Sequence, residues 1–250
     1  LNLNGHSLIA SGGHVLDYGA TINGLRATLR ANTVLRGLCG RIQTAANYAG
    51  TTYEIDLENG NFNENVTINN KDNLAMSGNE NYTHFGTLTV SFCDVFQAAG
   101  LGAKSIHINY GSYLVLHGLF IDGINQSADG FYLFNSDTYD VAFLTSMYSS
   151  TGIVCTDGTE ADFDYPLLSH NLVGLVSING SNVDIYNSFF CGTALDLKTY
   201  NFSSITASSC YFDGGTPSTS GSNIWHYGDQ SCSLAKTARQ TANTLSLIHI

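Results

Sequence analysis

The sequence predicts an all-β fold, a right-handed parallel β-helix (β-solenoid) with turns of about 22 residues. Three observations support this prediction. Charged residues make up only 12% of the 250-residue chain, short segments rich in β-branched and aromatic residues recur at a regular interval, and these segments lack helical spacing. Apolar residues make up 43%, which is enough for a continuous core. The many Asn, Ser, Thr and Gly residues suit tight turns between short strands.

Four segments share one pattern: an alternating strand, a small residue, two large apolar residues and a turn. They are Leu114–Gly123, Val141–Tyr148, Val183–Gly192 and Ile205–Gly214. We align them on the small residues Gly118, Ser146, Ser188 and Ser209, and Pro166 fills the double interval between Ser146 and Ser188. The period is therefore about 22 residues, with one longer loop before the second segment.

Strand alternation predicts which apolar side chains fill the core. We expect burial of Val141, Phe143, Phe163, Val183, Ile185, Phe189, Ile205 and Phe212. An Asn stands shortly before a strand at four positions, and Asn tolerates tight turns and bonds to a stacked neighbour. These are Asn109, Asn135, Asn179 and Asn201, although chance placement of so many asparagines explains them equally well.

Two other repetitive or all-β folds share some of these sequence features. A leucine-rich repeat has a similar period, but it needs regularly spaced leucines around an Asn, and these are missing. An antiparallel β-sandwich stays open as an alternative, because Asn-Gly pairs that favour hairpins begin at Asn4, Asn23, Asn59 and Asn179.

One stretch carries a family resemblance. Residues 53–69 and 73–78 place a strand, a Gly-containing turn and an aromatic residue before Glu-Asn-Val-Thr-Ile and an apolar-apolar-Gly close. This order is similar to the opening turns of the pectate-lyase-like β-helix superfamily, and residues 43–49 resemble the short helix that precedes them there. The resemblance covers roughly residues 42–214. That superfamily contains lyases, hydrolases, esterases, adhesins and phage tailspikes, so the fold does not select one function. Tailspikes of this fold are trimers, so the resemblance makes a homotrimer an expectation.

The chain divides into three parts. We expect residues 1–41 to form further turns or an N-terminal cap, residues 42–235 to form the β-helix, and residues 236–250 to form a tail. Residues 245–250 read like the translation of a sequencing-library adapter, so we expect them to be non-native and exclude them from fold reasoning. The chain is then expected to be a fragment of a larger protein.

The charge balance excludes several classes of partner. The net charge is −11, from 9 basic and 20 acidic residues. Binding to nucleic acid or to anionic membranes needs a basic face, which this composition does not supply. No apolar run is long enough for a membrane span. The six cysteines lack zinc-site spacing, and both buried thiols and disulfides stay open for them.

The strongest candidate site is a column of carboxylates. Asp140, Asp162 and Asp184 recur at the period of the solenoid, each directly before an inward apolar residue, so we expect all three to face outward on consecutive turns. Asp164 should share that face. Stacked like charges favour a raised pKa or a bound cation, and we predict a Ca²⁺ site at Asp140, Asp162 and Asp184. Pectate lyases, which the chain resembles, hold Ca²⁺ between such aspartates and a polyuronate.

A carbohydrate ligand is the expected partner of this column. We expect Tyr186 to lie beside it as a stacking platform for a sugar ring, and Lys198 to approach it from the next turn. The predicted ligand-binding residues are Asp140, Asp162, Asp164, Asp184, Tyr186 and Lys198. No catalytic residue is assigned, because lyase chemistry needs a base near the column and basic residues are scarce there.

These observations lead to one expectation and two alternatives. The chain is expected to be a glycan-binding or structural β-helix module of a larger extracellular, cell-surface or virion protein of the tailspike type. The first alternative is a polysaccharide lyase or glycoside hydrolase that acts on an acidic polysaccharide, and the second is a purely structural spacer.

Overall fold

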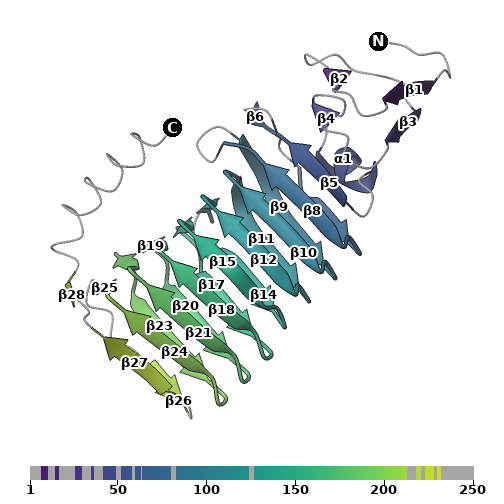
Figure 1. Cartoon of the computed structure of the whole chain (residues 1–250). Coiled ribbons are helices and arrows are strands. Elements are labelled where there is room, and N and C mark those ends of the chain that lie inside the picture. Colours follow the sequence, from purple (N-terminus) through teal and green to yellow (C-terminus); the bar gives the residue numbers. More distant parts are fainter. Residues whose placement is uncertain are drawn as a thin grey trace.

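Parallel strands stack into a β-solenoid of about 7 turns in the computed structural model of the chain (Figure 1). The structure describes residues 7–10, 15–16, 26–29, 35–36, 42–48, 52–57, 60–62, 64–79, 83–123, 127–212, 218–220, 223–227 and 230–231. Successive turns are spaced by ~22 residues, as the sequence predicts. Every strand pairing among the described residues is parallel, which excludes the antiparallel β-sandwich.

One face of the solenoid is a sheet with 11 strands among the described residues, called here the first sheet. Its strands in spatial order are β2 (Val15–Leu16), β4 (Leu35–Arg36), β5 (Thr52–Asp56), β8 (Asn73–Ser77), β10 (Val95–Ala99), β12 (Tyr113–His117), β15 (Thr138–Ala142), β18 (Glu160–Asp164), β21 (Asn182–Tyr186), β24 (Ser204–Ser208) and β27 (Asn223–Tyr227). The strands β1 (Ser7–Ala10) and β3 (Arg26–Leu29) pair with each other in a separate sheet.

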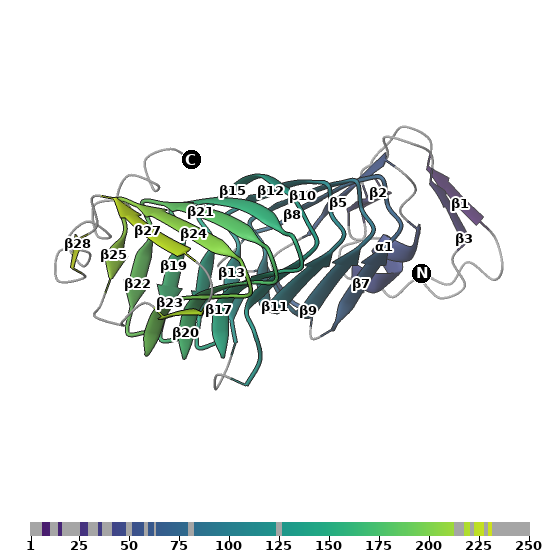
Figure 2. The same cartoon turned by 90° about the horizontal axis from the view of Figure 1, so that it is seen from below.

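The second sheet has 15 strands in the described part of the chain and forks into two arms (Figure 2). At the fork, β11 (Gly102–Asn109) pairs with β13 near its start and with β14 near its end. One arm contains β13 (Phe120–Asp122), β16 (Thr145–Met147), β19 (Leu167–Ser169), β22 (Phe189–Cys191), β25 (Tyr211–Phe212) and β28 (Gln230–Ser231). The other contains β14 (Phe131–Phe134), β17 (Thr151–Thr156), β20 (Val173–Ile178), β23 (Leu195–Tyr200) and β26 (Ser218–Ser220). Before the fork lie β6 (Gly60–Asn61), β7 (Val66–Asn69) and β9 (Thr83–Ser91).

A short helix, α1 (Ile42–Tyr48), precedes these turns, where the sequence resemblance places one. The Glu64 carboxylate caps its start by accepting the backbone N–H groups of Ile42 at 2.6 Å and Gln43 at 3.2 Å. The Gln43 side chain bonds to both the N–H and the carbonyl of Thr67 in β7, at 2.6 and 2.8 Å. The helix therefore satisfies backbone groups at this edge of the second sheet.

The core lies between the sheets and follows strand alternation. In β18 the side chains alternate between outside and inside, and Phe163 is buried with its ring edge-on to Phe131 at 6.1 Å. Of the eight predicted core residues, five are fully buried: Val141, Phe163, Val183, Ile185 and Ile205. Phe189 and Phe212 are only half-buried, and the prediction for Phe143 is wrong, because that side chain is 60% exposed.

The error at Phe143 comes from the corner that ends each strand of the first sheet. His117 pairs with Ala142, so the residue equivalent to Gly118 is Phe143 and not Ser146. Both residues have positive φ, 59° and 58°, and each N–H donates to the carbonyl of the following turn. This left-handed conformation turns the side chain away from the core. In later turns the same corner position falls on Tyr165, Asn187 and Ser209.

Buried hydroxyl groups stack inside another corner, where the second sheet returns to the first. The Thr159 N–H donates to the Ser181 Oγ, and the Ser181 N–H donates to the Ser203 Oγ, both at 3.2 Å. On the outside of this corner, the Asn201 side chain donates to the Asn179 Oδ1 at 2.8 Å. The expected asparagine stacking is therefore present at this pair.

The cysteines among the described residues are of two kinds. Cys93, Cys155 and Cys210 are buried thiols, and burial raises the pKa of Cys155 well above its ordinary value of 9.0. Cys191 is part of a disulfide. No helix in the described part of the chain is long and apolar enough to cross a membrane.

Candidate functional site

The predicted carboxylates lie on the outward face of the first sheet. Asp162 of β18 is directly opposite Asp184 of β21 in the register. Val141 pairs with Phe163, which places Asp140 of β15 next to Asp162 on the other side. The inward neighbours of these aspartates, Val141 and Phe163, are almost completely buried, so the aspartates face solvent. Asp140, Asp162 and Asp184 thus form one column on three consecutive turns.

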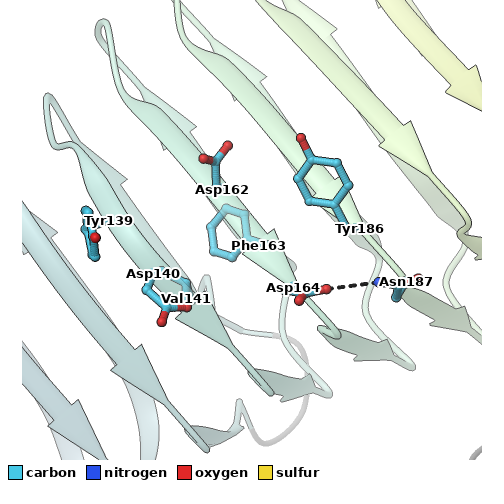
Figure 3. Close-up of a pocket in the computed structure, with 8 residues that line it drawn as sticks. All are labelled: Tyr139, Asp140, Val141, Asp162, Phe163, Asp164, Tyr186 and Asn187. Carbon is cyan, nitrogen blue, oxygen red and sulfur yellow. Dashed lines mark hydrogen bonds between the residues drawn. The ribbon is translucent and has the colours of Figure 1, made fainter.

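A shallow pocket of about 250 Å³ opens over this column (Figure 3). It is lined by Tyr139, Asp140, Val141, Asp162, Phe163, Asp164, Tyr186 and Asn187. Asp164 occupies the neighbouring outward column, opposite Tyr186, and its Oδ1 accepts a hydrogen bond from the Asn187 side chain at 3.1 Å. Four of the predicted ligand-binding residues therefore line one depression, and Asp184 stands beside them.

Partial burial and neighbouring carboxylates raise the pKa of two groups in the pocket. Partial burial, and then the like charges of Asp184 and Glu160, raise the pKa of Asp162 above its ordinary value of 3.8. Partial burial, followed by the carboxylates of Asp184, Asp162 and Asp164, raises the pKa of Tyr186. The central aspartate was expected to have a raised pKa. The leading cause, however, is desolvation and not repulsion within the column.

The structure also places a histidine at the site, which the sequence did not reveal. The Nε2 atom of His117 lies 2.9 Å from the Oδ2 atom of Asp140, and both side chains are 47% exposed. The register shifts between Leu114 and Val115, because β15 carries an extra residue at this point. A regular spacing of turns could not predict this pair, since the turn between β12 and β15 is longer than the others.

Aromatic rings surround the carboxylates. Tyr139 is 64% exposed and stacks on Tyr113 with centroids 4.3 Å apart and an angle of 23° between the ring planes. At the corner beyond β15 and β18, Phe143 and Tyr165 are stacked at 5.4 Å and 7°. Flat, exposed rings of this kind offer stacking surfaces to a ring-shaped ligand.

Among the described residues, neither Lys198 nor a metal-binding group is found at the carboxylate column. Lys198 lies on β23 in the second sheet, where its Nζ sits 4.7 Å from the centre of the Tyr200 ring. The chain passes around the solenoid between Asp184 and Lys198, so the lysine belongs to a different face. Within the described residues, no group of three or more His, Cys, Asp or Glu side chains is arranged to hold a metal ion. The Ca²⁺ site therefore stays a prediction.

Comparisons with known proteins do not indicate a function for this chain. No family model, no curated protein and no solved structure matches this chain.

Proposed function

We propose that the chain is a pectate-lyase-like β-helix module that binds carbohydrate across its first sheet. The observation that carries this proposal is the pocket in which Tyr139 and Tyr186 flank Asp162 and Asp164. Tyrosine rings stack on the apolar faces of sugars, while carboxylate oxygens accept hydrogen bonds from sugar hydroxyl groups. Exposed aromatic rings combined with fixed acceptors are a combination that suits a glycan.

We also propose that the module belongs to a larger extracellular, cell-surface or virion protein. The disulfide at Cys191 supports this location, because disulfides persist mainly in oxidising compartments. The low content of charged residues and the net charge of −11 fit a ligand other than nucleic acid. Association into a homotrimer remains part of the proposal, and sedimentation of the purified chain would test it.

A glycan array tests the binding proposal. The wild-type chain should bind a restricted set of glycans, and Tyr186→Ala should weaken that binding about tenfold or more, because it removes a stacking surface. Phe202→Ala is the matched control, since Phe202 is 90% exposed but belongs to another corner. An array with no bound glycan, or equal loss in both variants, would contradict the proposal.

An enzymatic function is the second candidate, and the pairing of His117 with Asp140 favours it. A histidine that is oriented by a carboxylate is a competent general base. In a lyase this base would take the proton from the carbon next to a uronate carboxyl group. The electron pair of that C–H bond would form a carbon–carbon double bond as the bond to the leaving sugar oxygen breaks, and water would protonate that oxygen. Incubation with polyuronates distinguishes the two reactions, because elimination gives an unsaturated product that absorbs ultraviolet light, whereas hydrolysis gives new reducing ends without this absorbance. Absence of both signals, or full activity in His117→Ala, removes this candidate.

A further inference from the structure

The pocket carries negative charge that the strands around it do not compensate. Asp140, Asp162 and Asp164 line it, and Asp184 and Glu160 adjoin it. The strands β12, β15, β18 and β21 contain no Lys or Arg. The histidine on these strands is His117, and its contact is with Asp140. A ligand that binds here therefore contacts a negatively charged surface.

The carboxylates differ in whether their oxygens already have a hydrogen-bond or ion-pair partner in the protein. One oxygen of Asp140 contacts His117, and one oxygen of Asp164 accepts from Asn187. The carboxylate of Asp162 accepts no hydrogen bond from any described residue, although it shares its strand with Asp164 and lies beside the strand of Asp140. Figure 3 shows it between the strand that carries Tyr139 and the strand that carries Tyr186. Asp162 thus has its full accepting capacity for a ligand.

The aromatic rings add a second preference. Tyr139 lies on β15 and Tyr186 on β21, so two strand spacings, roughly 10 Å in total, separate their strands. A short oligosaccharide can span this distance with Asp162 below its middle. Aromatic faces also attract cations through their quadrupole, so the same rings favour a ligand that combines sugar rings with positive charge.

From these observations we propose that the ligand of this pocket is a glycan with free amino groups, of the glucosamine type, whose ammonium group binds the Asp162 carboxylate. This inference rests on the proposed function and names its ligand class. An acidic glycan would place like charges together unless a metal ion intervened, and a neutral glycan would bond to the carboxylates without compensating their negative charge. An ammonium group supplies donors to carboxylate oxygens in charge-assisted hydrogen bonds.

Binding titrations with three oligosaccharides of equal length test the proposal. The probes are a glucosamine oligomer, its fully N-acetylated counterpart and an oligogalacturonate, each titrated calorimetrically into the full chain with and without Ca²⁺ at slightly acidic pH. The glucosamine oligomer should bind at least about tenfold more tightly than the acetylated one, as expected for a charge-assisted hydrogen bond. Asp162→Asn should remove most of this difference, while Asp94→Asn, at an exposed aspartate that does not line the pocket, should preserve it.

Each other outcome is decisive. If the acetylated oligomer binds equally well or better, or if oligogalacturonate with Ca²⁺ binds best, the inference is overturned and the proposed carbohydrate function stands. If no oligosaccharide binds, both are overturned. If an oligolysine of matched charge binds as tightly as the glucosamine oligomer, or if Asp94→Asn weakens binding as much as Asp162→Asn, the attraction is nonspecific and the inference is also overturned.

Discussion

Replacing Asp162 by Asn should stabilise the protein, because the substitution removes a charge that the fold places next to like charges. Asp162 lies directly opposite Asp184, and Glu160 precedes it on the same face of β18. Asn keeps the size and shape of the side chain. The backbone N–H of residue 162, which donates to the Thr138 hydroxyl at 2.8 Å, is unaffected by the change.

The size of the effect follows from the strand spacing. Adjacent strands lie about 4.8 Å apart, and two unit charges at such a distance repel by about 1 kcal/mol in a water-like dielectric. Like charges opposite each other in sheets destabilise by about 0.2–1 kcal/mol. Because Asp162 is exposed and screened by salt, we expect a gain of about 0.5 kcal/mol in the free energy of unfolding. For a chain of this size, that corresponds to a rise in Tm of about 1–2 °C.

The pH dependence has a definite sign. The folded-state pKa of Asp162 is raised above the ordinary value of 3.8, so the folded protein binds this proton more tightly than the unfolded chain does. The contribution of Asp162 to stability therefore falls as pH rises from 3.8 through the raised pKa. The gain in Tm from Asn should accordingly be absent at or below pH 3.8 and complete above the raised pKa.

Thermal melts followed by circular dichroism, over a series of pH values and at low and high salt, measure the effect. Asp94→Asn serves as the control, because Asp94 is exposed in the turn before β10 and away from the column. If Asp162→Asn melts at or below the wild-type temperature near neutral pH, or if its gain persists unchanged in acid, the electrostatic reasoning is refuted.

Four further measurements test the fold and the site. Ser181→Ala should lower the unfolding free energy by about 1–3 kcal/mol in denaturant titrations, because it leaves the buried Thr159 N–H without its acceptor; an effect no larger than that of Ser204→Ala, at a partly exposed position, would contradict this. Phe163→Ala should cost about 3–5 kcal/mol in the same titration, since its ring is fully buried, and a loss below 1 kcal/mol would disprove its core role. Millimolar Ca²⁺ should raise Tm by mass action, and this rise should vanish in Asp162→Asn; a melt that does not respond to Ca²⁺ would end the calcium prediction. Deleting residues 245–250 should leave Tm unchanged, and a drop of several degrees would show that they are native structure.

The period of the solenoid and the column of aspartates could be predicted from the sequence because both depend on alternation along strands. Asp162 and Asp184 each stand directly before an inward apolar residue, and parallel stacking at a constant interval brings such residues together. The same alternation predicts that Tyr186 faces outward beside the column, and in the structure it pairs with Asp164. These positions depend only on the alternation of neighbouring residues along a strand and on the length of one repeat.

The corners could not be predicted in the same way. Gly118, Phe143, Tyr165 and Asn187 occupy one equivalent corner position and share a left-handed backbone. Their side chains have no chemistry in common, because the hydrogen bonds that hold the corner are made by the backbone N–H groups. An alignment on small residues therefore chose Ser146 in place of Phe143.

The positions of His117 and Lys198 could not be predicted from the sequence for a related reason. An irregular register before Asp140 brings His117 to the site, and the passage of the chain around the solenoid places Lys198 on the second sheet. Both depend on the path of the chain between strands, which alternation does not record.

The order of strands in the two large sheets has a mechanical consequence. Beyond the fork, each strand pairs only with the equivalent strand of the turn before and the turn after. In such an architecture cohesion is summed over neighbouring interfaces, without contacts between distant turns. A force applied along the axis should peel turns from an end one after another, so a single-molecule extension trace should show repeated small steps, each releasing roughly the contour length of one turn.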